Sequence, residues 1–138
     1  MISFKLFDNK LFEQYIQKNY GGQPDYKISV KYNDFIDFFK PENEAEYAVI
    51  EYFGNAENIE KEFSLIKCKA LKKSMIHVFV SPATALKELN NVLKSMDNVD
   101  ICLSPGFYIY TDIDEELIDK NYKIRVISLR GSYNDWLS

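Results

Sequence analysis

The residues in this sequence best suited to catalysis or metal binding are a single histidine and a run of carboxylates. His77 is the only histidine, so a catalytic pair of histidine with a carboxylate or a cysteine would have to use it. It lies within the apolar run Ile76–Val80, where a structural imidazole with a hydrogen-bond partner is the usual case. We therefore interpret His77 as structural and predict that the protein is not an enzyme.

The acidic run 112–116, DIDEE, has carboxylates spaced like the start of a calcium-binding EF-hand loop. A loop that starts at Asp112 needs glycine and glutamate where this chain has Leu117 and Lys123. The run is more typical of the acidic first turn of a helix. Zinc is disfavoured because Cys68 and Cys102 are far apart and no CxxC or HxxxH spacing occurs. We predict no metal and no cofactor.

Motifs that bind phosphate or activate a serine are absent from the sequence. It has no GxxxxGK[ST], GxGxxG or GxSxG pattern, and only five glycines. Four lysines form a short basic cluster without interleaved aromatic residues: Lys67, Lys69, Lys72 and Lys73. Direct binding to nucleic acid is therefore disfavoured.

Charge is distributed in blocks along the chain, which has a net charge of −4. Residues 41–66 contain seven acids against Lys61 alone, and residues 97–119 contain seven acids and no base. Such blocks can steer an oppositely charged partner. Our candidate partner-binding residues combine acids of both blocks with two tyrosines: Glu42, Glu44, Glu46, Tyr108, Tyr110, Asp112, Asp114, Glu115, Glu116 and Asp119.

Length and composition predict one globular domain over residues 1–138. The chain is 46% hydrophobic and 15% aromatic, enough for a substantial core. We find no apolar run of about 18 residues and no signal-peptide pattern at the N-terminus, so we predict a cytoplasmic protein without a membrane span. In that compartment the two cysteines would be free thiols.

The clearest local pattern is a strand at Ile76–Val80 followed by an amphipathic helix. Ser81 and Pro82 fit the N-cap and first position of that helix. The spacing then predicts an apolar stripe facing the strand, which consists of Leu86, Leu89, Leu93 and Met96.

Other elements follow from alternation, helical spacing and turn residues. We expect strands at 2–7, 27–32, 44–53 and 123–129, and helices at 9–20 and 33–39, capped by Asp8 and Asn33. The apolar spacing within residues 55–73 predicts a helix, and a hairpin through Gly54-Asn55 is the alternative. Segments 99–103 and 107–111 flank a Ser-Pro-Gly turn typical of a hairpin, and 114–120 predicts a short acidic helix or turn. Together these elements predict a single α+β domain with a mixed sheet of about five to seven strands packed against two to four helices.

These features favour a non-enzymatic protein-binding module with an acidic, tyrosine-bearing surface for a basic protein partner. The size and charge are similar to those of small bacterial immunity or inhibitor proteins that neutralise toxins. Such a toxin is often a nuclease, which is basic because it holds phosphates. The alternatives are a small enzyme or ligand-binding domain with a carboxylate-based site, and an oligomeric structural or phage-type component. A pocket that collects Asp112, Asp114 and His77 would favour the first alternative.

Overall fold

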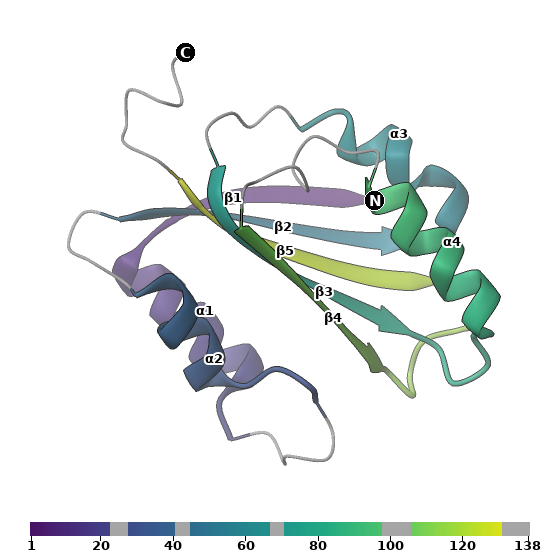
Figure 1. The fold of residues 1–138 in the computed structure, drawn as a ribbon, viewed down its shortest axis with the longest axis horizontal. Helices are drawn as coiled ribbons and strands as arrows, with labels where there is room; N and C mark the ends of the chain where they lie inside the picture. Colours follow the sequence, from purple (N-terminus) through teal and green to yellow (C-terminus); the bar gives the residue numbers. More distant parts are fainter. Residues whose placement is uncertain (23–27, 41–44, 67–70, 98–105, 131–138) are drawn as a thin grey trace.

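A computed structural model describes residues 1–22, 28–40, 45–66, 71–97 and 106–130. These residues form an α+β fold, as predicted, with a mixed sheet of five strands and helices on both of its faces (Figure 1). In chain order the elements are β1 (Ile2–Asp8), α1 (Asn9–Tyr20), α2 (Tyr32–Phe39), β2 (Glu46–Gly54), the 3₁₀ turn η1 (Ala56–Asn58), α3 (Ile59–Phe63), β3 (Leu71–Val80), α4 (Leu86–Asp97), β4 (Gly106–Ile113) and β5 (Tyr122–Arg130).

The strands lie in the order β1-β2-β5-β3-β4. Every neighbouring pair is antiparallel except β3 and β4, which run parallel. A parallel pair needs a crossover connection, and α4 lies on that connection. The carboxyl ends of β3 and β4 therefore lie at the same end of the sheet, where Val80 is opposite Ile113.

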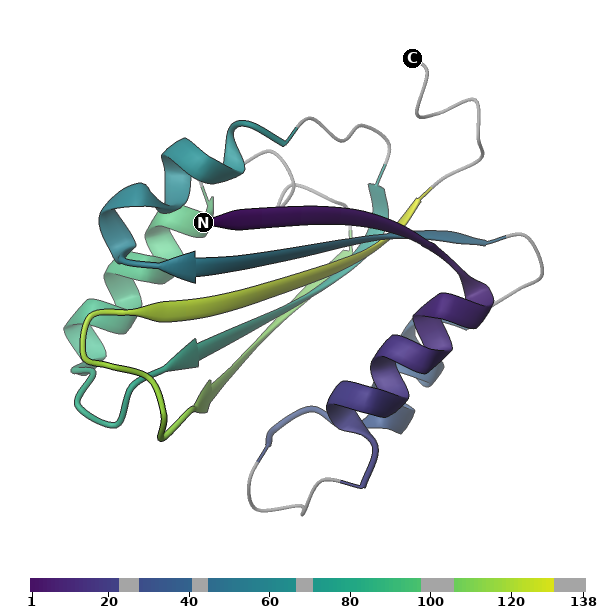
Figure 2. The same ribbon diagram turned by 180° about the vertical axis from the view of Figure 1, so that it is seen from behind.

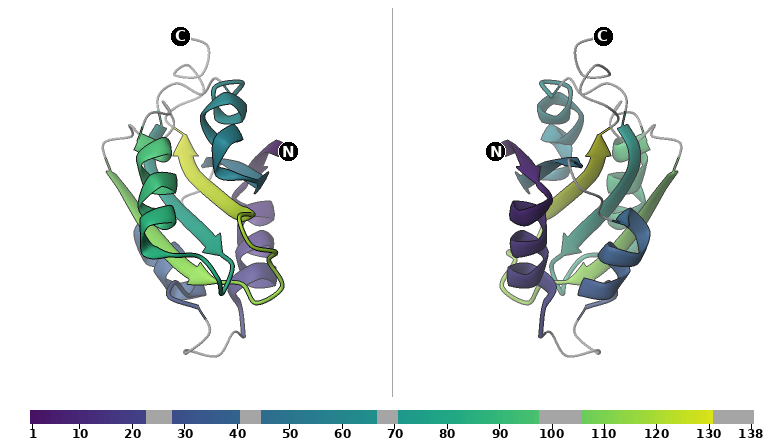
Figure 3. Two further views of the ribbon diagram at one scale, coloured as in Figure 1. Left: turned by 90° about the vertical axis from the view of Figure 1, so that its right-hand side faces the viewer. Right: turned by 90° about the vertical axis from the view of Figure 1, so that its left-hand side faces the viewer.

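Two clusters of buried side chains hold helices against opposite faces of the sheet. One cluster joins α3 and α4 to even-numbered residues of β3 and β5, such as Ile76 and Ile124. The other joins α1 and α2 to odd-numbered residues, such as Met75 and Ile127. Successive side chains of a strand point to opposite faces, so β3 and β5 have apolar side chains at both odd-numbered and even-numbered positions. Figures 1 and 3 show the two helix pairs on either side of the sheet.

Several local predictions are confirmed. The Asp8 carboxylate accepts a hydrogen bond of 2.8 Å from the Leu11 backbone nitrogen, and so caps α1. Gly21 ends α1, and Phe12 and Ile16 are fully buried on its inner face. Helix α2 begins one residue earlier than expected and its N-cap is Lys31, not Asn33. The strands expected at 2–7, 44–53, 107–111 and 123–129 are β1, β2, β4 and β5.

The prediction of a strand at 27–32 is wrong for residues 28–32, the part of this segment that the structure describes. Residues 28–31 form no strand, and Tyr32 already belongs to α2. This segment is held by hydrogen bonds to a carboxylate instead of by a neighbouring strand. The Ser29 backbone nitrogen and hydroxyl both donate to the Asp112 side chain of β4. Val30 is fully buried in the α1/α2 cluster. Alternation indicated which residues are buried, but it could not supply a partner strand.

The expected start of α4 is also wrong. Ser81 and Pro82 lie in a turn, in which Ser81 accepts a 3.1 Å backbone bond from Thr84, and the helix begins only at Leu86. The chain needs these residues to pass from the end of β3 to the helical layer. Leu86 is consequently 73% exposed, whereas Val92 and Met96 are fully buried and Leu89 is half-buried.

One further segment is less helical than predicted, and another takes one of its two expected forms. Among the described residues of the helix expected over 55–73, only those of η1 and α3 are helical, and β3 already begins at Leu71. Ile59 and Phe63 are nevertheless buried at the predicted spacing. Residues 114–120 form turns, one of the two forms expected for this segment, and Asp112 and Ile113 before them belong to β4. The hairpin partner expected at 99–103 and both cysteines lie outside the described residues.

Replacing Met96 with alanine should destabilise the protein by about 2–5 kcal/mol, because the buried side chain would leave a cavity between α4 and the sheet. Leu86→Ala is the matched control in the same helix and should change the free energy of unfolding by less than about 0.5 kcal/mol, since Leu86 is exposed. Urea melts measure both values. Equal losses in the two variants would contradict this orientation of α4.

Candidate functional site

A groove lies at the carboxyl ends of the parallel strands β3 and β4. It has a volume of about 980 Å³ and is bounded by the loop before α4, the start of α4, the end of β4 and the β4–β5 turn. Figure 3 shows the connections that leave β3 and β4 at the same end of the sheet. Strand order and the β3–α4–β4 crossover therefore create this groove.

Four of the candidate acids line the groove, and they come from the end of β4 and the turn after it: Asp112, Asp114, Glu115 and Glu116. Glu115 and Glu116 are exposed. Lys123 and Arg125 also line the groove, but both are near carboxylates. The Lys123 Nζ lies 3.3 Å from Asp114 Oδ2 and the Arg125 Nε lies 3.7 Å from Glu51 Oε2.

The remaining candidates lie elsewhere. Glu46 starts β2, at the opposite end of the sheet, since β2 runs antiparallel to β5 and β5 antiparallel to β3. Tyr108 is 57% exposed and packs edge-on against Phe38 of α2, with ring centroids 5.2 Å apart. Tyr110 is half-buried against the α1/α2 cluster, and Asp119 is exposed in the β4–β5 turn. Glu42 and Glu44 lie outside the described residues. The structure thus brings one acidic block to the groove and separates it from Glu46 and the exposed Tyr108.

Apolar side chains make up the rest of the groove. Leu86 of α4 is 73% exposed and Ile113 of β4 is 60% exposed, and both line it. Exposed large apolar side chains beside charged residues are typical of a binding surface. The groove can therefore offer apolar contact and negative charge to one ligand.

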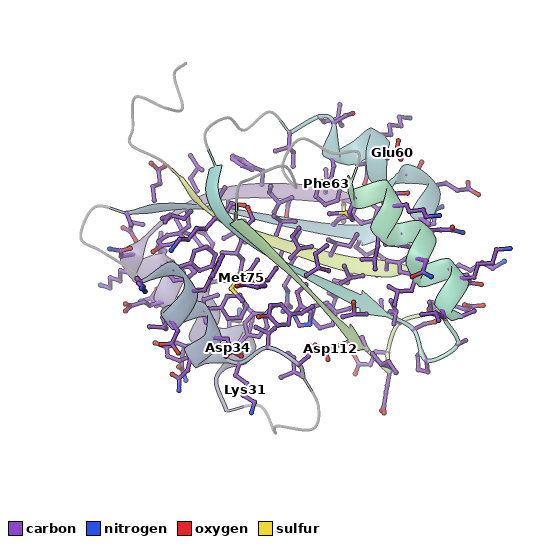
Figure 4. The ribbon with its side chains drawn as sticks, in the orientation of Figure 1. Lys31, Asp34, Glu60, Phe63, Met75 and Asp112 are labelled. Carbon is purple, nitrogen blue, oxygen red and sulfur yellow. The ribbon has the colours of Figure 1, made fainter. Side chains whose placement is uncertain are left out.

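Behind the groove, three side chains form a buried chain of hydrogen bonds. His77 Nε2 lies 2.6 Å from Asp112 Oδ2, and the Tyr20 hydroxyl lies 2.9 Å from His77 Nδ1. A carboxylate only accepts, so His77 Nε2 carries the proton and donates it to Asp112. In the neutral ring Nδ1 then accepts from the Tyr20 hydroxyl. Figure 4 shows Asp112 near the tip of β4.

Burial lowers the pKa of His77 to about 4, although the hydrogen bond and the charge of Asp112 act in the opposite direction. The imidazole is therefore neutral at pH 7, with its side chain only 3% exposed. Burial also raises the pKa of Tyr20, which keeps its hydroxyl protonated. Both groups keep the proton positions that this chain of hydrogen bonds requires.

The order of these groups differs from that of a catalytic triad. In a triad the histidine meets the reacting atom and the carboxylate lies behind it. Here Asp112 is nearest the groove, and the Tyr20 residue at the far end is 2% exposed. Asp112 also accepts bonds of 2.9 and 2.8 Å from the Ser29 nitrogen and hydroxyl. The arrangement thus joins residues 28–31 to β4.

Arg125 was not singled out from the sequence, where it lies within the strand expected at 123–129. Its guanidinium carbon lies 5.0 Å from the centre of the Phe79 ring and 5.6 Å from that of Tyr20. Aromatic faces and the nearby Glu51 balance this partly buried charge. Tyr20 and Ser29 were also missed, because their roles depend on contacts 57 and 83 residues away along the chain.

In the part of the chain that the structure describes, no group of three or more histidine, cysteine or acidic residues could hold a metal ion. No helix among the same residues is long and apolar enough to cross a membrane.

Comparisons with known proteins give little further information. No protein-family model matches the sequence, and no curated protein matches it. A solved structure with a similar arrangement is the empty FtsZ dimer of M. jannaschii, at a TM-score of 0.40 and 16% identity. The match covers 62% of this chain and 27% of the FtsZ chain. A likeness at this level supports no conclusion about function.

Stability should fall as the pH falls from 6.5 to about 4, partly because of His77. The unfolded chain binds a proton at this residue near pH 6.5, whereas the folded protein binds it only near pH 4. The contribution is complete above pH 6.5 and amounts to roughly 3 kcal/mol. His77→Gln retains an amide donor for Asp112 but cannot titrate. Urea melts from pH 7 to pH 4 should show a flatter pH dependence in this variant.

Because His77 is the only histidine, the difference between the two pH curves can be assigned to this residue. Carboxylates that titrate in the same range contribute to both proteins and cancel. Parallel curves for the wild type and His77→Gln would show that the imidazole is not held neutral in the folded state.

Proposed function

We propose that this protein is a non-enzymatic binding module whose groove holds a basic, partly apolar segment of another protein. The observation that supports this is the acidic rim beside exposed Leu86 and Ile113 in one groove of about 980 Å³. Complementary charge would accelerate association with a basic partner, and the apolar contacts would slow dissociation.

Glu115 and Glu116 are the most available acids of the rim. Asp112 already accepts bonds from Ser29 and His77, and Asp114 binds Lys123. Glu115 and Glu116 are exposed in the β4–β5 turn. These two side chains would therefore meet the cations of the partner first, with Asp112 serving to hold the groove in shape.

A basic toxin, such as a nuclease, is the partner class that we propose within this function. A nuclease carries positive charge around its phosphate-binding site, and an acidic protein that covers that site would neutralise it. The exposed Tyr108 lies on β4 away from the carboxyl end and could widen the contact area, since tyrosine is frequent at interfaces.

A small-molecule site is the second candidate function, and the volume of the groove favours it. Ligand pockets are generally about 300–1,000 Å³, a range that includes this groove. Asp112 and Asp114 line it as a carboxylate-based site requires, while His77 lies behind Asp112 and has little access to a ligand. Titration with free arginine tests this candidate: binding as tight as that of a basic peptide would favour it.

Glu115→Lys combined with Glu116→Lys should lower the association rate of a basic peptide roughly tenfold, at the low end of the range for electrostatic steering. The probe is a synthetic peptide that alternates arginine and leucine, and its association is followed by stopped-flow fluorescence. Added salt should reduce the wild-type rate toward that of the variant.

The matched control is Glu13→Lys combined with Glu57→Lys. Both residues are exposed and neither lines the groove. This variant therefore keeps the acidic rim intact while its net charge equals that of the variant changed at Glu115 and Glu116. It should bind nearly as fast as the wild type. Equal slowing in both double variants would show that net charge alone steers the peptide, and would remove the groove from the proposal.

A further inference from the structure

Strand β1 forms one edge of the sheet, and its outer side is exposed. β1 pairs only with β2 among the described strands. Its central residues 3–6 are all exposed, including Phe4 at 40% and Leu6 at 44%. In Figure 2, β1 runs along the upper edge of the sheet. An open edge with large apolar side chains can pair with another strand.

The backbone groups that face outward on β1 can be identified. Met1 and Phe53 exchange two hydrogen bonds, of 2.7 and 2.9 Å, so Met1 is a hydrogen-bonded position toward β2. Such positions alternate along an antiparallel pair. The N–H and C=O groups of Ile2, Phe4 and Leu6 therefore point away from the sheet and have no strand partner within the described chain.

β1 has few of the features that normally protect an edge strand. Its register with β2 is continuous from Ile2 to Asp8 without a bulge, and the strand contains no proline. Lys5 is the one charged residue between Ile2 and Phe7. Natural edges are commonly protected by prolines, bulges or several charges. In the part of the chain that the structure describes, this edge is therefore accessible to a further strand.

We propose that β1 pairs antiparallel with β1 of a second copy of this chain, in a register that places Phe4 opposite Phe4. Ile2 then faces Leu6 of the second copy through outward hydrogen-bonding positions. Ser3 faces Lys5 of the second copy on the other side of the sheet. The two sheets join into one, and aromatic and aliphatic pairs continue across the junction.

The polar and apolar residues of 1–7 follow the same order in both directions from Phe4, which favours a second copy as the partner, and Lys5 selects this register. A two-residue shift would place Lys5 directly opposite Lys5, and like charges at that position are destabilising. In the Phe4-centred register Lys5 faces a neutral serine, and residues 1–7 of each copy are matched around Phe4. The dimer would leave the groove free, because the groove lies by β4 at the other edge of the sheet.

Sedimentation of the full-length protein over a wide concentration range tests the dimer. The expected result is a monomer–dimer equilibrium that Phe4→Pro abolishes, because proline removes an outward N–H that β2 does not use. Circular dichroism checks that the variant is folded. A wild-type protein that remains monomeric to millimolar concentration, or a dimer that a folded Phe4→Pro variant still forms, would overturn the proposal.

Two substitutions at one exposed position test the register without depending on proline. Ser3→Asp creates two ion pairs with Lys5 across the dimer, and Ser3→Lys creates two repulsive pairs. The dissociation constant should fall roughly 2- to 30-fold in the first variant and rise by a similar factor in the second.

Stability within the monomer should change in the opposite direction, because Ser3 is paired with Glu51 of β2. An effect on the fold alone would therefore make Ser3→Lys the better variant. Dissociation constants that are equal in the two variants, or that change in the order opposite to our expectation, would exclude this register.

Discussion

Burial of the sheet on both faces is the constraint on which the rest of this structure depends. Helices α3 and α4 cover one face of β3 and β5, and α1 and α2 cover the other. A polar side chain in either strand is removed from water and costs free energy unless a buried partner satisfies it. Ser74 and Ser128 meet this requirement on one face, with their hydroxyl oxygens 2.7 Å apart.

The same constraint on the opposite face explains the neutral histidine and the fixed carboxylate. His77 is 2% exposed, and it is satisfied by Tyr20 on one ring nitrogen and Asp112 on the other. Asp112 in turn binds Ser29, which fixes the segment before α2. A structural requirement of the core thus places a carboxylate among the residues that line the groove.

The groove and the exposed edge of β1 arise where this covering of the sheet ends. The groove is at the carboxyl ends of β3 and β4, where the chain leaves the sheet for α4 and for the β4–β5 turn. The exposed edge is β1, which has a neighbour on one side only. These surfaces lie at opposite edges of the sheet. A β1-paired dimer would therefore present two grooves and could bind a partner with two basic segments more tightly than one copy does.

The sequence by itself determined the α+β class, most strands, the cap at Asp8 and the end of α1, because alternation, helical spacing and capping chemistry are local. It also identified the acidic run 112–116. Only the tertiary structure decided that Leu86 is exposed, that residues 28–31 form no strand, and that Asp112 is held by Ser29 and His77. Those outcomes depend on strand order and on contacts between residues 35 and 83 positions apart. Local patterns carry no information about which distant residue will meet which.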